Sequence, residues 1–183
     1  MTDLIASIKT AGVFALNAHS SHPPTAVLIE DATVCRSDCD SQLIICIPFS
    51  AHVRLSGLAL RAVAGEEPTV LKLYTDKREL SFDDIESTRA NFEVKSFEAG
   101  KPIALPANKF PACMSVTIFM DAEGKDTVAL SRLVLFGSPV ETADMTKLTA
   151  VRRAGPHPSS LLPAPTSLTH SLSHTHASFG PQG

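Results

Sequence analysis

The chain has 183 residues, of which 44% are hydrophobic and 19% are charged, a length that allows one ordinary domain with extensions. Sixteen Lys and Arg residues against nineteen Asp and Glu residues give a net charge of −3. This balance, without any basic run of about five residues, disfavours nucleic-acid binding through phosphate neutralisation, and no apolar window of roughly 18 residues predicts a membrane span.

The first twelve residues carry the signals of a short helix. Thr2 suits the N-cap and Gly12 suits the C′ position. We expect this helix to pack Leu4, Ile5 and Ile8 against the body of the domain, because the three fall on one helical face. An acidic residue near the start and a lysine within the apolar run argue against a secretory signal.

From residue 26 to about residue 137, short apolar or alternating runs are separated by turn residues, a pattern typical of β-strands. The candidate strands are Ala26–Ile29, Gln42–Phe49, Val53–Ala64, Val70–Thr75, Phe92–Phe97, Ile103–Leu105, Ser115–Asp121 and Thr127–Phe136.

One candidate strand contains a change of phase. Val53 and Leu55 alternate with polar residues, but Leu58 and Leu60 are out of phase with them. A bulge at Gly57 would return all four side chains to the same face of a sheet.

The last candidate strand repeats this feature, because Val128 and Leu130 are out of phase with Leu133 and Leu135. Two long strands with such slips suit a curved, twisted sheet. The run 43–47 is apolar at every position, which places it centrally in a sandwich or under a covering loop.

A helical turn is predicted at residues 81–86 (SFDDIE). Ser81 and Asp84 have the spacing of a capping box, and Phe82 and Ile85 share a face. The three acidic residues of this turn could serve as general acids or bases, but acidic first turns usually reflect the helix dipole.

Strands with frequent turns and little helix between them predict an all-β fold, an antiparallel β-sandwich. We expect one domain over residues 1–153. Residues 154–183 contain Pro, Ser, Thr and His and no Asp, Glu, Lys or Arg, so we expect a disordered tail. Its His170, His174 and His176 lack a pre-organised site, which disfavours specific metal binding.

No CxxC pair occurs among the four cysteines, so free thiols in a reducing compartment are expected. The stretch CRSDCD places Cys35, Cys39 and two carboxylates within six residues. Asp38 and Asp40 disfavour a thiolate at Cys39, and no further ligand follows at zinc-module spacing. The stretch therefore reads better as the polar start of a strand than as a metal or redox site.

Catalytic motifs such as GxSxG, GxGxxG, a Walker loop and HExxH do not occur. His52, in a predicted turn, is the histidine of the strand region that could act as a base. Cys46 lies in an apolar run and is predicted to be a core thiol, while Cys113 lacks an activating neighbour. We expect no catalytic, cofactor-binding or metal-binding residue. A thiol or metal-dependent enzyme centred on Cys35 and Cys39 is the disfavoured alternative.

Several blocks of the sequence together resemble the PITH domain, named for proteasome-interacting thioredoxins. In order they are SDCDSQLIICIPFSAHVRLSGLAL, LKLYTD, SFDDIES, SVTIFM and LVLFGSPVETADMTKL. The first segment, DLIASIKTAGVFALN, ends in Leu16 and Asn17 and also resembles the start of that domain. The resemblance covers residues 3 to about 152.

The resemblance implies a jelly-roll-like β-sandwich similar to galactose-binding domains and a non-catalytic role. That role is docking on the proteasome regulatory particle through its subunits. We expect a monomer of the cytoplasm and nucleus, with no cofactor and no nucleic-acid or membrane partner. Relatives fused to thioredoxin carry an upstream CGPC motif that this chain lacks, so their redox activity is not expected here. The resemblance is compatible with a stand-alone protein and with a chain that lacks an upstream domain.

A small-ligand or carbohydrate-binding module is a second interpretation, based on architecture alone. Such sites often use exposed aromatic residues, whereas this chain has no Trp and one Tyr, Tyr74. Arg54, Arg61 and Lys72 alternate with apolar neighbours, which indicates only that they face solvent. The binding surface itself is therefore not predicted.

Overall fold

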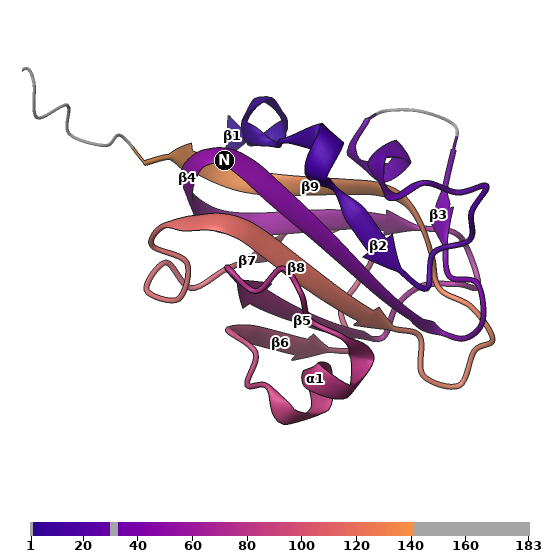
Figure 1. The fold of residues 1–183 in the computed structure, drawn as a ribbon. Coiled ribbons are helices and arrows are strands. Elements are labelled where there is room, and N and C mark those ends of the chain that lie inside the picture. Colours follow the sequence, from indigo (N-terminus) through magenta and orange to yellow (C-terminus); the bar gives the residue numbers. More distant parts are fainter. Residues whose placement is uncertain (1, 30–32, 141–183) are drawn as a thin grey trace, which may run out of the picture. The chain divides into compact units, whose positions relative to one another are not determined.

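A computed structural model describes residues 2–29 and 33–140 (Figure 1). Its strands are β1 (Thr2–Asp3), β2 (Phe14–Leu16), β3 (Cys35–Arg36), β4 (Gln42–Ala62), β5 (Val70–Thr75), β6 (Phe92–Lys95), β7 (Ile103–Ala104), β8 (Cys113–Asp121) and β9 (Ala129–Pro139). Its helical segments are the 3-10 turns η1 (Ile5–Ser7), η2 (Thr10–Gly12) and η3 (Pro24–Leu28) and the α-helix α1 (Phe82–Ser87).

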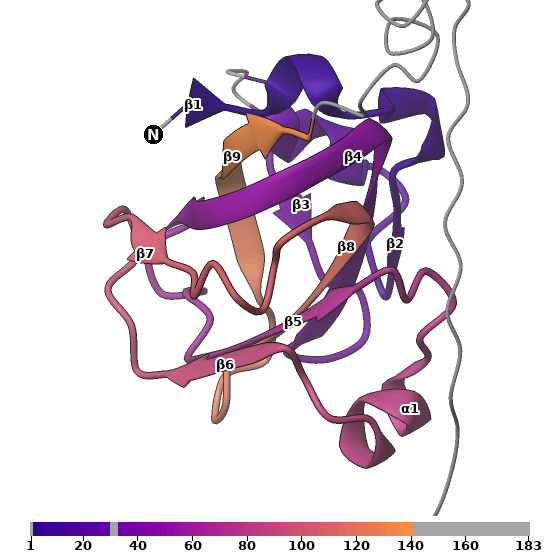
Figure 2. The same cartoon turned by 90° about the vertical axis from the view of Figure 1, so that its left-hand side faces the viewer.

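Strand β4 has 21 residues and belongs to both layers of a sandwich. Its residues 42–48 pair with β8, its residues 53–62 pair with β9, and the register shifts between Pro48 and Val53. One layer has the order β2-β4-β8-β5-β6, and the other contains β7, β4 and β9, with β1 and β3 along the far edge of β9 (Figures 1 and 2). All these pairings are antiparallel.

The all-β sandwich is confirmed, but the prediction of two strands separated by a turn at His52 is wrong. The chain stays extended from Gln42 to Ala62 because it changes layers through an irregularity of the ladder, not through a turn. His52 is an exposed strand residue whose carbonyl accepts a hydrogen bond from the Val140 N–H at 2.8 Å.

The two layers meet in one apolar core, and both predicted phase changes are bulges. The ladder between β4 and β9 skips Ser56, one residue before the predicted bulge position Gly57, so that Val53, Leu55, Leu58 and Leu60 are all buried in that core. It also skips Ser131, which buries the four apolar residues predicted to share a face, Val128, Leu130, Leu133 and Leu135. Each bulge therefore compensates for the phase change in the sequence, so that the apolar side chains on both sides of it point into the core.

Helix α1 covers the outer face of the first layer. Ser81 Oγ accepts a hydrogen bond from the Asp84 N–H and the Asp84 carboxylate accepts one from the Ser81 N–H, so the predicted capping box is confirmed. Ile85 is buried in a second apolar cluster with Ile44 and Tyr74. This cover explains why Ile44 is apolar although it faces away from the main core, which contains Leu43, Ile45 and Ile47.

The predicted N-terminal helix is wrong in detail. Thr2 and Asp3 pair with β9 as a short strand, and two 3-10 turns follow in place of one α-helix. Leu4 is buried in the main core and its N–H donates to the Leu135 carbonyl at 2.9 Å, whereas Ile5 is 37% exposed. Pairing with the edge of β9 thus overrides the local preference of these residues for a helix.

The predicted strand Ala26–Ile29 is also wrong, because residues Pro24–Leu28 form η3. Pro24 occupies the first helical turn, where a missing N–H has no cost, and Ala26, Val27 and Leu28 are buried. A short apolar run does not distinguish a buried strand from a buried helical turn.

The predicted strands from residue 70 onward agree with β5, β6, β7, β8 and β9 within a few residues. The sequence pattern does not predict strands β2 and β3. In the described part of the chain, no helix is long and apolar enough to cross a membrane. The predicted domain boundary at residue 153, the predicted tail and its three histidines lie outside the described residues.

Candidate interaction surface

The stretch CRSDCD begins as strand β3 and continues as a loop held by Asn17. The Asn17 Oδ1 accepts a hydrogen bond from the Cys39 N–H at 3.0 Å. Its Nδ2 donates to Asp40 Oδ1 at 2.7 Å and to the Gln42 carbonyl at 2.6 Å. Two segments that the sequence resemblance singled out therefore contact each other, and their contact shapes the start of β4.

The two thiols of this stretch point to different environments. Cys35 is buried, and burial raises its pKa from 9.0 to about 11, which keeps the thiol protonated and unreactive. Cys39 is exposed, and its Sγ lies 3.9 Å from Asp38 Oδ2. Among the described residues no group of three or more His, Cys, Asp or Glu side chains is arranged to hold a metal ion.

The other two cysteines are core thiols, as predicted for Cys46. Both are buried. Burial, followed by the charge of Asp76, raises the pKa of Cys113 to about 12. The Cys113 thiol donates to the Val53 carbonyl at 3.5 Å. No described feature activates either sulfur as a nucleophile.

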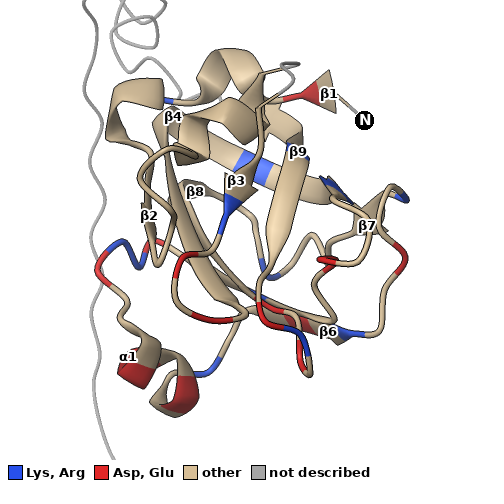
Figure 3. Cartoon of the chain, turned by 90° about the vertical axis from the view of Figure 1, so that its right-hand side faces the viewer, with Lys and Arg blue, Asp and Glu red and all other residues tan. Residues whose placement is uncertain are grey.

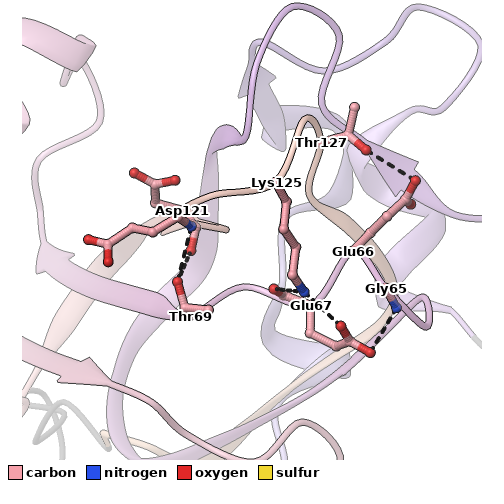
Figure 4. A network of polar contacts seen from close by, with 8 residues as sticks. Gly65, Glu66, Glu67, Thr69, Asp121, Lys125 and Thr127 are labelled. Carbon is pink, nitrogen blue, oxygen red and sulfur yellow. Dashed lines mark hydrogen bonds and ion pairs between the residues drawn. The ribbon is translucent and has the colours of Figure 1, made fainter.

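A network of polar contacts joins the loop after β4 to the hairpin between β8 and β9 (Figure 4). Lys125 Nζ lies 2.8 Å from Glu67 Oε2, and this hydrogen bond, with backbone N–H groups, lowers the pKa of Glu67 to about 2. Thr127 donates to Glu66 Oε1 at 3.1 Å, and Thr69 donates to the Asp121 carbonyl at 3.3 Å. These carboxylates have hydrogen-bond partners inside the network, so their role is to hold loops together.

Two hollows adjoin on the outer face of the first layer beside α1. The smaller, of about 190 Å³, lies where β4, β8 and β5 meet the helix, and its floor includes Phe119. Lys72 Nζ lies 5.7 Å from the centre of the Phe119 ring, a cation–π geometry. The hollow therefore has an apolar floor with charged side chains around it.

The larger hollow, of about 500 Å³, extends from the same wall toward β6 and shares Lys72, Ile85 and Glu86 with the smaller one. Its further lining includes Arg89 and Glu93. The acidic residues of α1 stand out at this side of the molecule in Figure 3. We call the two hollows together the α1 face; charged side chains of both signs surround the buried apolar residues Ile85 and Phe119 there.

The sequence pattern identified Lys72 as solvent-facing but gave no sign that it borders a hollow. That hollow depends on where α1 packs, which only the tertiary structure determines. Tyr74 anchors the helix, because its hydroxyl donates to the Ile85 carbonyl at 3.4 Å, and burial raises its pKa.

A sequence model of the PITH domain matches residues 1–154 of this chain. The chain belongs to the PITH domain family. Thioredoxin-like protein 1 of Schizosaccharomyces pombe is 35% identical over 126 residues, which are 63% of this chain and 43% of that protein. PITH domain-containing protein ZK353.9 of Caenorhabditis elegans is 34% identical over 106 residues, 55% of this chain and 50% of that protein. The chain thus spans about half the length of these relatives.

Solved structures with the same fold come from sugar-binding proteins. One is the module CBM32-5 of a Clostridium perfringens family 89 glycoside hydrolase, in complex with GalNAc-β-1,3-galactose. Its TM-score is 0.57 at 12% identity, and the alignment covers 74% of this PITH domain chain and 99% of the module. A fucolectin from striped bass serum has a TM-score of 0.54 at 12% identity, covering 76% and 48%. At such identities the likeness shows a galactose-binding-like β-sandwich and no more.

Proposed function

We propose that this chain is a non-catalytic protein-interaction module that binds the regulatory particle of the proteasome, in the cytoplasm and nucleus. Its membership of the PITH domain family carries the proposal, because the family is named for proteasome-interacting thioredoxins. The buried, protonated thiols of Cys35 and Cys113 support a role that does not depend on sulfur chemistry.

We propose the α1 face as the contact surface. Its two hollows share Lys72, Ile85 and Glu86, so one partner segment can fill both. Residues at the centre of an interface usually contribute most of the binding energy. Reversing a charge in this shared wall should therefore weaken binding more than reversing a charge elsewhere.

Co-purification of tagged chain with intact proteasomes tests this proposal. We expect the wild-type chain and K9E to recover proteasomes equally, because Lys9 is exposed and does not line either hollow. We expect K72E to recover several-fold less. Far-UV circular dichroism of each variant checks that the fold is intact.

Two results would count against the proposal in different ways. Recovery no greater than that of an unrelated β-sandwich would contradict proteasome binding itself. Equal recovery with K72E and K9E would contradict the α1 face, and crosslinking of the wild-type chain to purified proteasomes would then locate the true surface.

A carbohydrate-binding role has support at the level of fold alone. The only tyrosine, Tyr74, is fully buried and the chain has no tryptophan, so neither residue type offers an exposed ring for sugar stacking. A glycan array with wild-type chain is expected to give no signal above an unrelated β-sandwich.

A further inference from the structure

Two arginines stand opposite each other on the outer face of the second layer. Arg61 of β4 and Arg132 of β9 are direct partners in the antiparallel ladder. Side chains of such a pair lie on the same face of the sheet, and like charges in this position repel each other. Between them, β4 and β9 carry three arginines and no acidic residue.

Nothing in the described part of the chain neutralises this pair. None of the ion pairs formed by the described residues involves Arg61 or Arg132. The Nη1 atom of Arg132 is buried and has no hydrogen-bond partner there. A buried guanidinium nitrogen without an acceptor is unfavourable, and two adjacent positive charges favour an acceptor that is anionic.

A small hollow of about 90 Å³ adjoins the two arginines. Its floor is the pair two positions along the ladder, on the same face as the arginines, where Ala59 is opposite Val134. The turn at Gly100 forms a wall, held by a hydrogen bond from the Gly100 N–H to the Leu60 carbonyl at 2.7 Å. A small alanine at this rung leaves space that a larger side chain would fill.

The charged turn that lines the hollow does not supply the missing anion. Glu98 and Lys101, on the turn that contains Gly100, form an ion pair with each other at 2.6 Å. Arg54, farther along β4, donates to the Pro111 carbonyl at 3.4 Å. The arginine pair is therefore left to bind an anion from elsewhere.

We propose that Arg61 and Arg132 form a carboxylate-binding site for an acidic segment of a partner protein. A planar guanidinium matches a carboxylate with two parallel hydrogen bonds. The hollow over Ala59 and Val134 accepts the methylene groups that lead to that carboxylate. The site lies on the opposite layer from the α1 face, and the inference holds whether or not the partner is the proteasome.

Titration of the full chain with the blocked peptide acetyl-(Glu-Val)4-amide tests the site by NMR. The same peptide with Gln in place of Glu is the matched control. We expect shifts of the amide signals of Ala59, Arg61 and Val134 with the Glu peptide and not with the Gln peptide. Added salt should weaken binding.

Substitutions identify the residues responsible. We expect R61Q and R132Q each to weaken Glu-peptide binding at least five-fold, a range typical of losing a charged hydrogen bond, and K9Q to leave it unchanged. The unfolding midpoint of R61Q should not fall, because the change removes a like-charge repulsion. A59L, which fills the hollow, should weaken binding without a change of charge.

Three outcomes would overturn the proposal. The first is equal binding of the Glu and Gln peptides, and the second is binding of inorganic phosphate without binding of the Glu peptide. The third is that a carboxylate of the same chain already occupies the arginine site. In that case the double variant E30Q/D31N would bind the Glu peptide more tightly than the wild-type chain. The effects of E30Q/D31N and R132Q on the free energy of unfolding would also be non-additive in a double-mutant cycle. Glu30 and Asp31 lie outside the described residues.

Discussion

Asn17 combines an unusual backbone conformation with a set of side-chain hydrogen bonds. Its φ is +62°, in the left-handed region, which asparagine tolerates better than most residues. Its side chain bonds the backbone and a carboxylate of the loop before β4. The Leu16-Asn17 pair of the PITH domain resemblance thus has a structural explanation in this chain.

Replacing Asn17 should separate these two contributions. N17G keeps the left-handed backbone accessible but removes the side-chain bonds, and we expect it to lower the unfolding free energy by about 1–3 kcal/mol. N17A should lose about 1 kcal/mol more, because alanine resists positive φ. Urea unfolding measures both. An N17A protein as stable as N17G would contradict the backbone contribution.

The buried thiols predict a loss of stability at alkaline pH. The pKa values of Cys35 and Cys113 in the folded protein, about 11 and about 12, lie above the ordinary value of 9.0. The two protonated thiols therefore contribute their full share to the free energy of unfolding below pH 9. This share is lost as the pH rises above 9, because the same thiols ionise first in the unfolded chain.

Urea unfolding at pH 8 and pH 10 checks this linkage. We expect C113A to lose less stability between these pH values than the wild-type chain, although it starts less stable. C39S, which changes an exposed thiol, is the matched control and should keep the wild-type pH dependence. Identical pH dependence in C113A and wild type would refute the assignment.

At the scale of elements, the bulge at Ser56 decides which side chains of β4 enter the core. Deleting Ser56 would move Val53 and Leu55 to the opposite face while Leu58 and Leu60 stay inward. Exposing two such side chains costs about 3–6 kcal/mol, a large part of the stability of an ordinary domain.

Thermal unfolding tests this deletion against the deletion of Ala107, which is exposed in a turn. We expect the Ala107 deletion to fold with a small loss, and the Ser56 deletion to be unfolded or to melt far lower. A Ser56 deletion as stable as the Ala107 deletion would show that the register adapts without cost.

The sequence pattern predicts these bulges well and the N-terminal part of the chain poorly, for a physical reason. When the alternation of four leucines and valines changes phase in a two-layer sheet, a bulge is the simplest way to bury all four side chains. The bulge can therefore be predicted from the local sequence. The residues around Leu4 carry helix signals, but Thr2 and Asp3 pair with the edge of β9 and form a strand instead. The run at Val27 is too short for its period to identify its structure.

The candidate sites lie beyond prediction for a related reason. Arg61 and Arg132 are 71 positions apart in sequence, and only the register of β4 against β9 makes them neighbours. The α1 face similarly depends on the packing of Ile85 against Tyr74. Alternation in a strand identifies which side chains face solvent but not what stands beside them.

At the scale of the whole molecule, the fold depends on pairings between distant parts of the chain. The first strand pairs with the last, and β3 pairs with β9. Such topologies fold in milliseconds to seconds. Tyr74 is a natural probe, because it is the only tyrosine in a chain without tryptophan and lies fully buried under α1.

Stopped-flow refolding followed by tyrosine fluorescence should therefore show a main phase between about 1 ms and a few seconds. Far-UV circular dichroism should report the same rate constant if α1 docks as the sandwich forms. A slower fluorescence phase alone would show that the α1 face assembles after the two layers.

The pairing of β1 with β9 also brings the two ends of the described fold together, since Thr2 is opposite Gly137. The chain enters and leaves the sandwich at neighbouring points, so a pull applied across these points loads the short β1 ladder one hydrogen bond at a time. Strand β1 would peel away before the core yields. In mechanical terms, the sandwich yields first at this two-pair ladder, before the longer ladder between β4 and β9 opens.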